Sequence, residues 1–143
     1  MKEISVYIEF WEYLRSFGLK TIEIVESEDA WNYKISQTEF SIIQTFNHTN
    51  QAIFEDAGSW FLKDSKKFSP TSNQKNNLNL SIGRMISAIQ NFDEKKLEEE
   101  FTFQWGDRTT IKDALKQNLF HAISHFGQIR ERVGLLKRNP QYN

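Results

Sequence analysis

The stretch IKDALKQNLFHAISHFGQIRERVGLLK, residues 111–137, decides the fold class of this 143-residue chain. Its apolar residues recur every three or four positions, which is the spacing of one face of an α-helix: Ile111, Leu115, Ala122, Phe126, Ile129, Val133 and Leu136. Thr110 and Asp113 have the spacing of a capping box before this stretch, and Pro140 marks where a helix can no longer continue. The pattern predicts a long amphipathic helix over 111–137 that buries one face against other helices.

Three further segments carry the same periodicity and predict three more helices. Residues 4–25 hold an aromatic stripe with Trp11 at its centre, and residues 78–91 hold a stripe of Leu, Ile and Met. Between them, Ser41 and Gln44 form a capping box that starts a helix extending to about residue 62. In the first helix, Gly18 is a position where the helix could weaken or kink.

The connections differ in length and composition. Residues 64–77, DSKKFSPTSNQKNN, form the clearest linker, with Pro70 and little to bury. Fully extended at ~3.3 Å per residue, this linker could reach about 45 Å, enough to run back along a bundle and set the second and third helices parallel. Residues 27–39 read as a loop, and 93–100 as a short acidic helical turn. Residues 101–109, FTFQWGDRT, predict an extended loop.

Four helices without a convincing strand or repeat predict an all-α fold, a four-helix bundle that forms a single domain over residues 1–143. A net charge of −1 leaves no basic field for a phosphate backbone, so we expect no nucleic-acid partner. The chain has no cysteine, which excludes disulfides, thiolate metal sites and a cysteine nucleophile. Acidic residues interrupt the apolar start, and no apolar run approaches the ~20 residues of a membrane span. We therefore expect a cytoplasmic protein without a membrane partner.

The chain has only three histidines, and two of them lie four residues apart in the longest predicted helix. This spacing places the imidazoles of His121 and His125 on one helical face, where both can reach one metal ion. The third histidine, His48, belongs to the second helix and faces away from its strongest apolar stripe. Small residues share the face of His48, which suits either a cavity or a solvated surface, so periodicity alone does not place His48 at the metal.

Other readings of these residues stay open. A single histidine is more often a surface or hydrogen-bonded residue than a ligand. The run Glu98–Glu100 is typical of a solvated face. Glu55 and Asp56 are expected on the surface, with the alternative that they orient a metal ligand from behind.

The segment from Leu119 to Ile129, LFHAISHFGQI, resembles the His-x-x-x-His-x-Gly-Gln-Ile signature of the DinB-like (DinB/YfiT) superfamily. Nearly the whole chain shares this resemblance, through its aromatic first helix, its loop with Trp and Tyr, and the Trp105-Gly106 turn. The Ser-capped second helix also matches, because His48 follows Ser41 by seven residues. The resemblance implies a four-helix bundle in up-down-down-up order. It also implies a divalent metal ion on His48, His121 and His125, with Zn or Ni favoured and Fe or Mn as alternatives.

The sequence departs from the family pattern at two positions. Ser124 stands where many members have a further histidine, and Phe126 stands where many have an arginine, which puts an anionic-substrate or helix contact in doubt. Neither change removes a predicted metal ligand. Gly127 is expected to let a neighbouring helix or side chain approach closely.

Three imidazoles leave at least one open coordination position, the layout of a catalytic metal centre. The resemblance implies a metal-dependent transferase that takes a low-molecular-weight thiol as cosubstrate, or a hydrolase, acting on a small-molecule substrate. The alternatives are a non-enzymatic metal- or ligand-binding bundle and an interaction protein with a vestigial site. The sequence identifies no catalytic acid or base, because Tyr7, Tyr33 and Glu55 cannot be placed. The aromatic surplus and the family resemblance also predict a homodimer.

Overall fold

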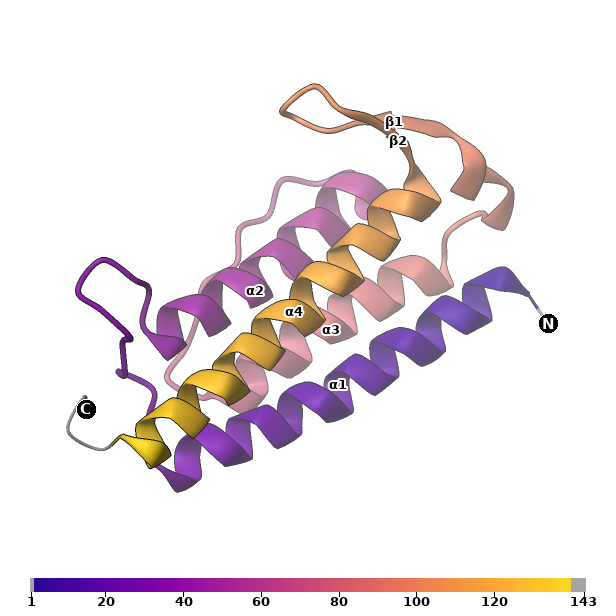
Figure 1. The fold of residues 1–143 in the computed structure, drawn as a ribbon. Helices are drawn as coiled ribbons and strands as arrows, with labels where there is room; N and C mark the ends of the chain where they lie inside the picture. The colour runs from indigo at the N-terminus through magenta and orange to yellow at the C-terminus, as the bar shows by residue number, and fades with distance from the viewer. Residues whose placement is uncertain (1, 140–143) are drawn as a thin grey trace.

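The computed structural model describes residues 2–139, which form four long helices with a short hairpin before the last one (Figure 1). The long helices are α1 (Glu3–Ser27), α2 (Ile42–Ala57), α3 (Gln74–Gln90) and α4 (Ile111–Arg138). The shorter elements are the π-helical turn η1 (Gly58–Leu62), the 3₁₀ turn η2 (Glu94–Glu98), and the strands β1 (Glu100–Thr102) and β2 (Arg108–Thr110). The predicted all-α four-helix bundle is therefore confirmed. The predicted stop at Pro140 lies outside the described residues.

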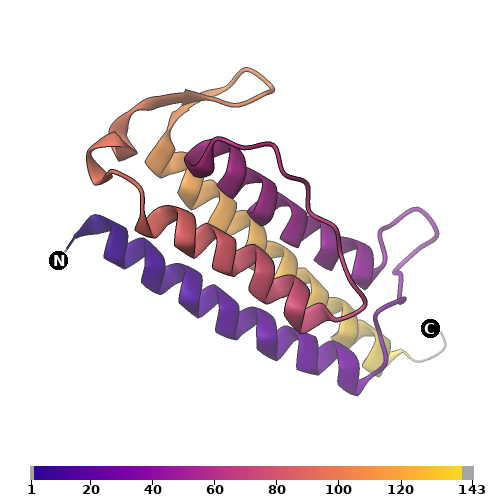
Figure 2. The ribbon, with the colours of Figure 1, turned by 180° about the vertical axis from the view of Figure 1, so that it is seen from behind.

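The helices follow an up-down-down-up order (Figure 1). Helix α1 packs against α3 and α4, and α2 packs against the same two helices, so α1 lies diagonally opposite α2. The segment between α2 and α3 runs back along the bundle, which sets these two helices parallel as the linker length permits (Figure 2). The core between the helices is apolar and fully buries the side chains of Trp11, Phe46 and Phe126.

The capping signals mark two helix starts correctly. The Ser41 hydroxyl accepts a hydrogen bond from the Gln44 backbone N–H at 3.2 Å, and the Gln44 side chain accepts one from the Ser41 backbone N–H at 2.9 Å. At α4, the Thr110 hydroxyl accepts from the Asp113 backbone N–H at 3.1 Å. Each interaction satisfies a backbone donor that the first helical turn leaves without a partner.

The third helix begins at Gln74, four residues before the predicted start at 78. Its cap is Asn73, whose side chain accepts a hydrogen bond from the Asn76 backbone N–H at 3.0 Å. The first turn, QKNN, is almost entirely polar, so the apolar periodicity could not reveal it. Residues 74–77 were predicted to belong to the linker, and this was wrong, because they form the first turn of α3.

The prediction that the chain forms no strands was also wrong. Residues predicted as an extended loop form an antiparallel hairpin, in which Phe101 pairs with Thr109. Gly106 closes the turn with a φ of +100°, a conformation that side-chain-bearing residues rarely adopt. The alternation of apolar and polar residues in FTFQW was the local signal for this short strand pair.

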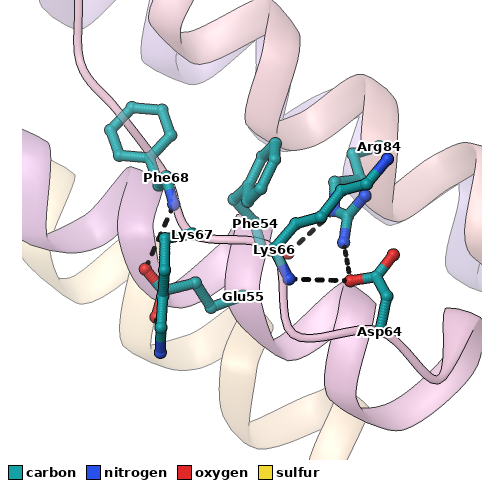
Figure 3. A network of polar contacts seen from close by, with 7 residues as sticks. All are labelled: Phe54, Glu55, Asp64, Lys66, Lys67, Phe68 and Arg84. Atoms are coloured by element: carbon teal, nitrogen blue, oxygen red, sulfur yellow. Dashed lines mark hydrogen bonds and ion pairs between the residues drawn. The ribbon is translucent and has the colours of Figure 1, made fainter.

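A polar network fixes the crossover segment to the bundle (Figure 3). The Arg84 side chain pairs with Asp64 and donates a hydrogen bond to the Phe54 carbonyl at 3.0 Å. The Glu55 carboxylate accepts a hydrogen bond from the backbone N–H of Phe68 at 3.2 Å. Glu55 is thus half-buried and holds the crossover in place, which corrects its expected surface position.

Candidate metal centre

The three histidines meet between α2 and α4. His48 lies on α2, and His121 and His125 lie one turn apart on α4. The rings of His121 and His125 have centroids 4.4 Å apart, and His48 lies 5.2 Å from the first ring and 5.4 Å from the second. One ring nitrogen from each residue lies within 4.8 Å of the others. The fold therefore brings His48 to the pair on α4, which periodicity alone could not establish.

The surroundings favour the neutral imidazole at His48 and His121. Burial, followed by the charges of His125 and His48, lowers the pKa of His121 from 6.5 to about 4. Burial, followed by the charge of His125, also lowers the pKa of His48. A transition metal binds the neutral imidazole, so both residues are already in the form that ligation requires near neutral pH.

Gln128 orients the third imidazole. Its side-chain oxygen lies 2.8 Å from Nδ1 of His125. Because an amide oxygen can only accept, this contact assigns the ring proton to Nδ1 and leaves the lone pair on Nε2. The same Nε2 lies 3.0 Å from Nε2 of His121. The donor set, its spacing and this supporting hydrogen bond together fit one divalent ion of the kind that nitrogen ligands bind.

A cavity of about 740 Å³ adjoins the histidines. His48 and His121 belong to its lining, together with residues of α2, η1, the crossover, the hairpin and α4. Glu55 also lies in the lining. Tyr7 and Tyr33 are both buried elsewhere, so neither is available to this cavity as an acid or base.

Asp56 lines the same cavity, and the expectation that it is a surface residue was wrong. Its carboxylate accepts a hydrogen bond from the Asn118 side chain at 2.7 Å. Burial raises the pKa of Asp56 to about 6, although the hydrogen bond from Asn118 opposes this rise. No periodicity distinguishes Asp56 from a solvated acid, because its burial depends on α4 and on the hairpin.

The hairpin supplies an aromatic wall that the sequence analysis did not assign to the site. Phe101, Phe103 and Trp105 line the cavity together with Trp60 of η1. Sequence reasoning found the aromatic residues but could not place them, because a hairpin of this kind folds over a helix end through long-range contacts.

The departures from the family pattern also have defined positions. Ser124 is exposed, and Phe126 is fully buried in the core, so Phe126 cannot contact a substrate in the cavity. Gly127 is exposed, and a Cβ added there would meet no described atom within 4 Å. The expected close approach at Gly127 was therefore wrong.

The fold and the site define a class: a four-helix bundle whose second and fourth helices bring three histidines together around a candidate metal position. The solved structure of a DinB-like protein, YjoA, from Bacillus subtilis is similar to this chain, with a TM-score of 0.75 and 14% sequence identity over 92% of each chain. At this identity the likeness establishes the DinB-like fold. No protein-family model matches the chain, and no curated protein sequence matches it. Within residues 2–139, the structure contains no helix that is long and apolar enough to cross a membrane.

Proposed function

We propose that His48, His121 and His125 bind one divalent metal ion and that this centre serves a metal-dependent transferase or hydrolase. The observation that carries the proposal is the convergence of three ring nitrogens within 4.8 Å of one another beside a cavity. The lowered pKa values of His48 and His121 and the DinB-like fold support it.

Zn and Ni are the ions that an all-imidazole site favours, and Fe or Mn are the alternatives. The first test is elemental analysis of protein purified without an affinity tag and incubated with zinc or nickel. We expect about one equivalent of metal per chain, because three nitrogen ligands from one protein define one site. A wild-type protein that stays free of metal after this incubation contradicts the proposal.

Three protein ligands leave a coordination position for another molecule. A bound divalent ion would lower the pKa of a thiol or a water molecule in that position and so supply a nucleophile. The chain has no cysteine, so a reacting thiol would come from a low-molecular-weight cosubstrate. The cavity, at about 740 Å³, suits a small-molecule substrate. Asp56, with its raised pKa, is placed to hold or release a proton in this cavity.

Dependence on added thiol distinguishes the two reactions. A thiol transferase should be inactive without thiol and should show a rate that saturates with thiol concentration, whereas a hydrolase should turn over esters or amides in buffer alone. The matched controls are the His125→Ala variant, which lacks one ligand, and the Ser124→Ala variant, which keeps all three. If a panel of thiols and esters gives no rate above His125→Ala, a non-enzymatic metal- or ligand-binding bundle is the better description.

A further inference from the structure

One wall of the cavity is a continuous set of aromatic rings. The Trp60 ring meets the Phe101 ring edge to face, with centroids 5.6 Å apart, and Phe101 meets Phe103 at 5.3 Å. Trp105 stacks on Phe103 with centroids 4.3 Å apart and an interplanar angle of 8°. The Trp105 side chain is nevertheless 69% exposed, so a large ring surface stays uncovered at the edge of the cavity.

The Trp105 ring is held in place despite this exposure. Its indole N–H donates a hydrogen bond to the Asp107 carboxylate at 2.8 Å across the hairpin turn. A ring fixed by stacking and by a hydrogen bond loses little conformational entropy when a ligand covers it. The hairpin therefore presents a preformed apolar surface toward the cavity.

The α2 and α4 side of the cavity carries hydrogen-bond acceptors. The Asn118 side chain is 5% exposed and donates through Nδ2 to Asp56. Its Oδ1 is buried and receives no hydrogen bond from any residue in 2–139. A buried acceptor without a donor is unfavourable, so a ligand N–H or O–H group that reached this oxygen would relieve that cost. The Asp56 carboxylate adds a second acceptor on the same wall.

We propose that this cavity binds a small molecule that combines a flat aromatic ring with a hydrogen-bond-donating group. The ring lies against the aromatic wall formed by Trp60 and the hairpin, and the N–H or O–H group faces Asp56 and Asn118. This assignment names the substrate class of the metal site and so builds on the proposed function. The binding contacts themselves do not include the metal ion.

Three probe molecules separate the contribution of the aromatic ring from that of the hydrogen-bond donors. Benzamide has the ring and the N–H donors, N,N-dimethylbenzamide lacks the donors, and cyclohexanecarboxamide lacks the aromatic ring. Titration of the metal-free protein, followed by NMR shifts of the tryptophan indole signals, should give a dissociation constant of order millimolar for benzamide, as expected for about nine non-hydrogen atoms. Each of the other probes should bind about threefold to tenfold more weakly.

Single substitutions test whether benzamide binds in this cavity. Trp105→Ala should weaken benzamide binding about threefold to tenfold, because it removes exposed ring surface at the cavity. The matched control is Tyr13→Ala, which removes an aromatic ring that is 64% exposed on α1 and outside the cavity lining, and it should leave binding unchanged. Asp56→Ala should reduce the preference for benzamide over N,N-dimethylbenzamide, with circular dichroism used to check the fold.

Equal affinity for the three probes, or no saturable shift with benzamide, overturns the proposal. An equal loss from Tyr13→Ala and Trp105→Ala also overturns it. The His125→Ala variant separates this result from the fate of the metal site, because His125 does not line the cavity. If wild type binds benzamide but no metal, the ligand class is supported and the proposed function is contradicted. If wild type binds metal but not benzamide, the metal site is supported and the ligand class is contradicted.

Discussion

The helix contacts made by α1 differ in character from the contact between α2 and α4. Where α1 meets α3 and α4, the buried part of the contact is apolar and closed. A Cβ added at Gly18 would lie 2.8 Å from a methyl carbon of Leu78 and 3.1 Å from the ring of Phe126. Gly18 does not interrupt α1, which continues to Ser27. The expected weak point is thus a position where the neighbouring side chains pack closely against the helix.

Where α2 meets α4, the inner part of the contact is apolar, with Phe46 and Phe126 ring centroids 5.9 Å apart, and the outer part is polar and partly open. It contains the three histidines, the Asp56–Asn118 hydrogen bond and the adjoining cavity. His48 is exposed, and the other two histidines are only partly buried, so these polar groups contribute little net stability. The comparison indicates that the apolar interior stabilises the bundle, whereas the polar outer part of the α2–α4 contact holds the candidate metal site. Variants on each side should therefore change different measured quantities.

The largest effect is expected for His125→Ala. Loss of one of three nitrogen ligands should lower the affinity for zinc or nickel by at least about a hundredfold, because even the loss of a residue that only orients a ligand costs up to that much. The metal-free variant should unfold at a denaturant concentration close to that of metal-free wild type, since the His125 imidazole is partly exposed and is not part of the apolar core. Isothermal titration calorimetry and urea unfolding measure the two quantities.

Ser124→Ala is the matched control for this experiment, because Ser124 is the exposed residue next to His125. It should change neither the metal affinity nor the unfolding midpoint. A metal-free His125→Ala protein that loses its helical circular dichroism would mean that the polar part of the α2–α4 contact also supports the fold.

A substitution in the apolar contact of α1 should change the free energy of unfolding and leave the metal affinity unchanged. Gly18→Val should lower the free energy of unfolding by about 2 kcal/mol, because the added methyl groups overpack a buried helix contact. Its metal affinity should equal that of wild type. Gly127→Val is the control, because a Cβ added there approaches no neighbouring helix or side chain within 4 Å, and this variant should stay within about 0.5 kcal/mol of wild type. Equal destabilisation by the two variants would remove the claim that Gly18 marks a closed contact.

Asp56 gives the α2–α4 side a pH dependence. In the folded chain its pKa is about 6, against an ordinary value of 3.8, because burial disfavours the carboxylate. Between these values the unfolded chain has released this proton while the folded chain keeps it, so stability falls as pH rises from 4 to 6. Asp56→Asn should therefore be more stable than wild type at pH 7, by about 1 kcal/mol after allowance for partial exposure, and by less at pH 4.

Urea unfolding at both pH values measures this difference. Glu9→Gln, at an exposed position on α1, is the control and should show no such pH-dependent gain. If Asp56→Asn gains the same stability at pH 4 and pH 7, ionisation of Asp56 is not the cause.

The sequence predicted what depends on local periodicity and failed where distant segments meet. The helices, the Ser41 cap and the His121/His125 pair follow from spacing along one chain segment. The place of His48 at the site came from the family resemblance, because the small residues on its face suit either cavity or solvent. The burial of Asp56 and the hairpin wall require the crossover and the hairpin to fold over the end of α2. These contacts join residues far apart in sequence, and no local pattern encodes them.

The smallest effect on stability is expected at the outer surface of α1 and α4. Phe10 and Tyr13 on α1 and Phe120 on α4 are 47%, 64% and 63% exposed. We expect a second copy of the chain to cover exposed rings such as Phe120, as the predicted homodimer requires. Phe120→Ser should change the free energy of unfolding of the monomer by no more than about 0.5 kcal/mol and should shift the mass measured by light scattering toward the monomer. Phe40→Ser, at an exposed phenylalanine just before α2, should leave the mass unchanged. A wild-type mass of one chain at micromolar concentration would contradict the homodimer and leave the comparison of the two internal contacts intact.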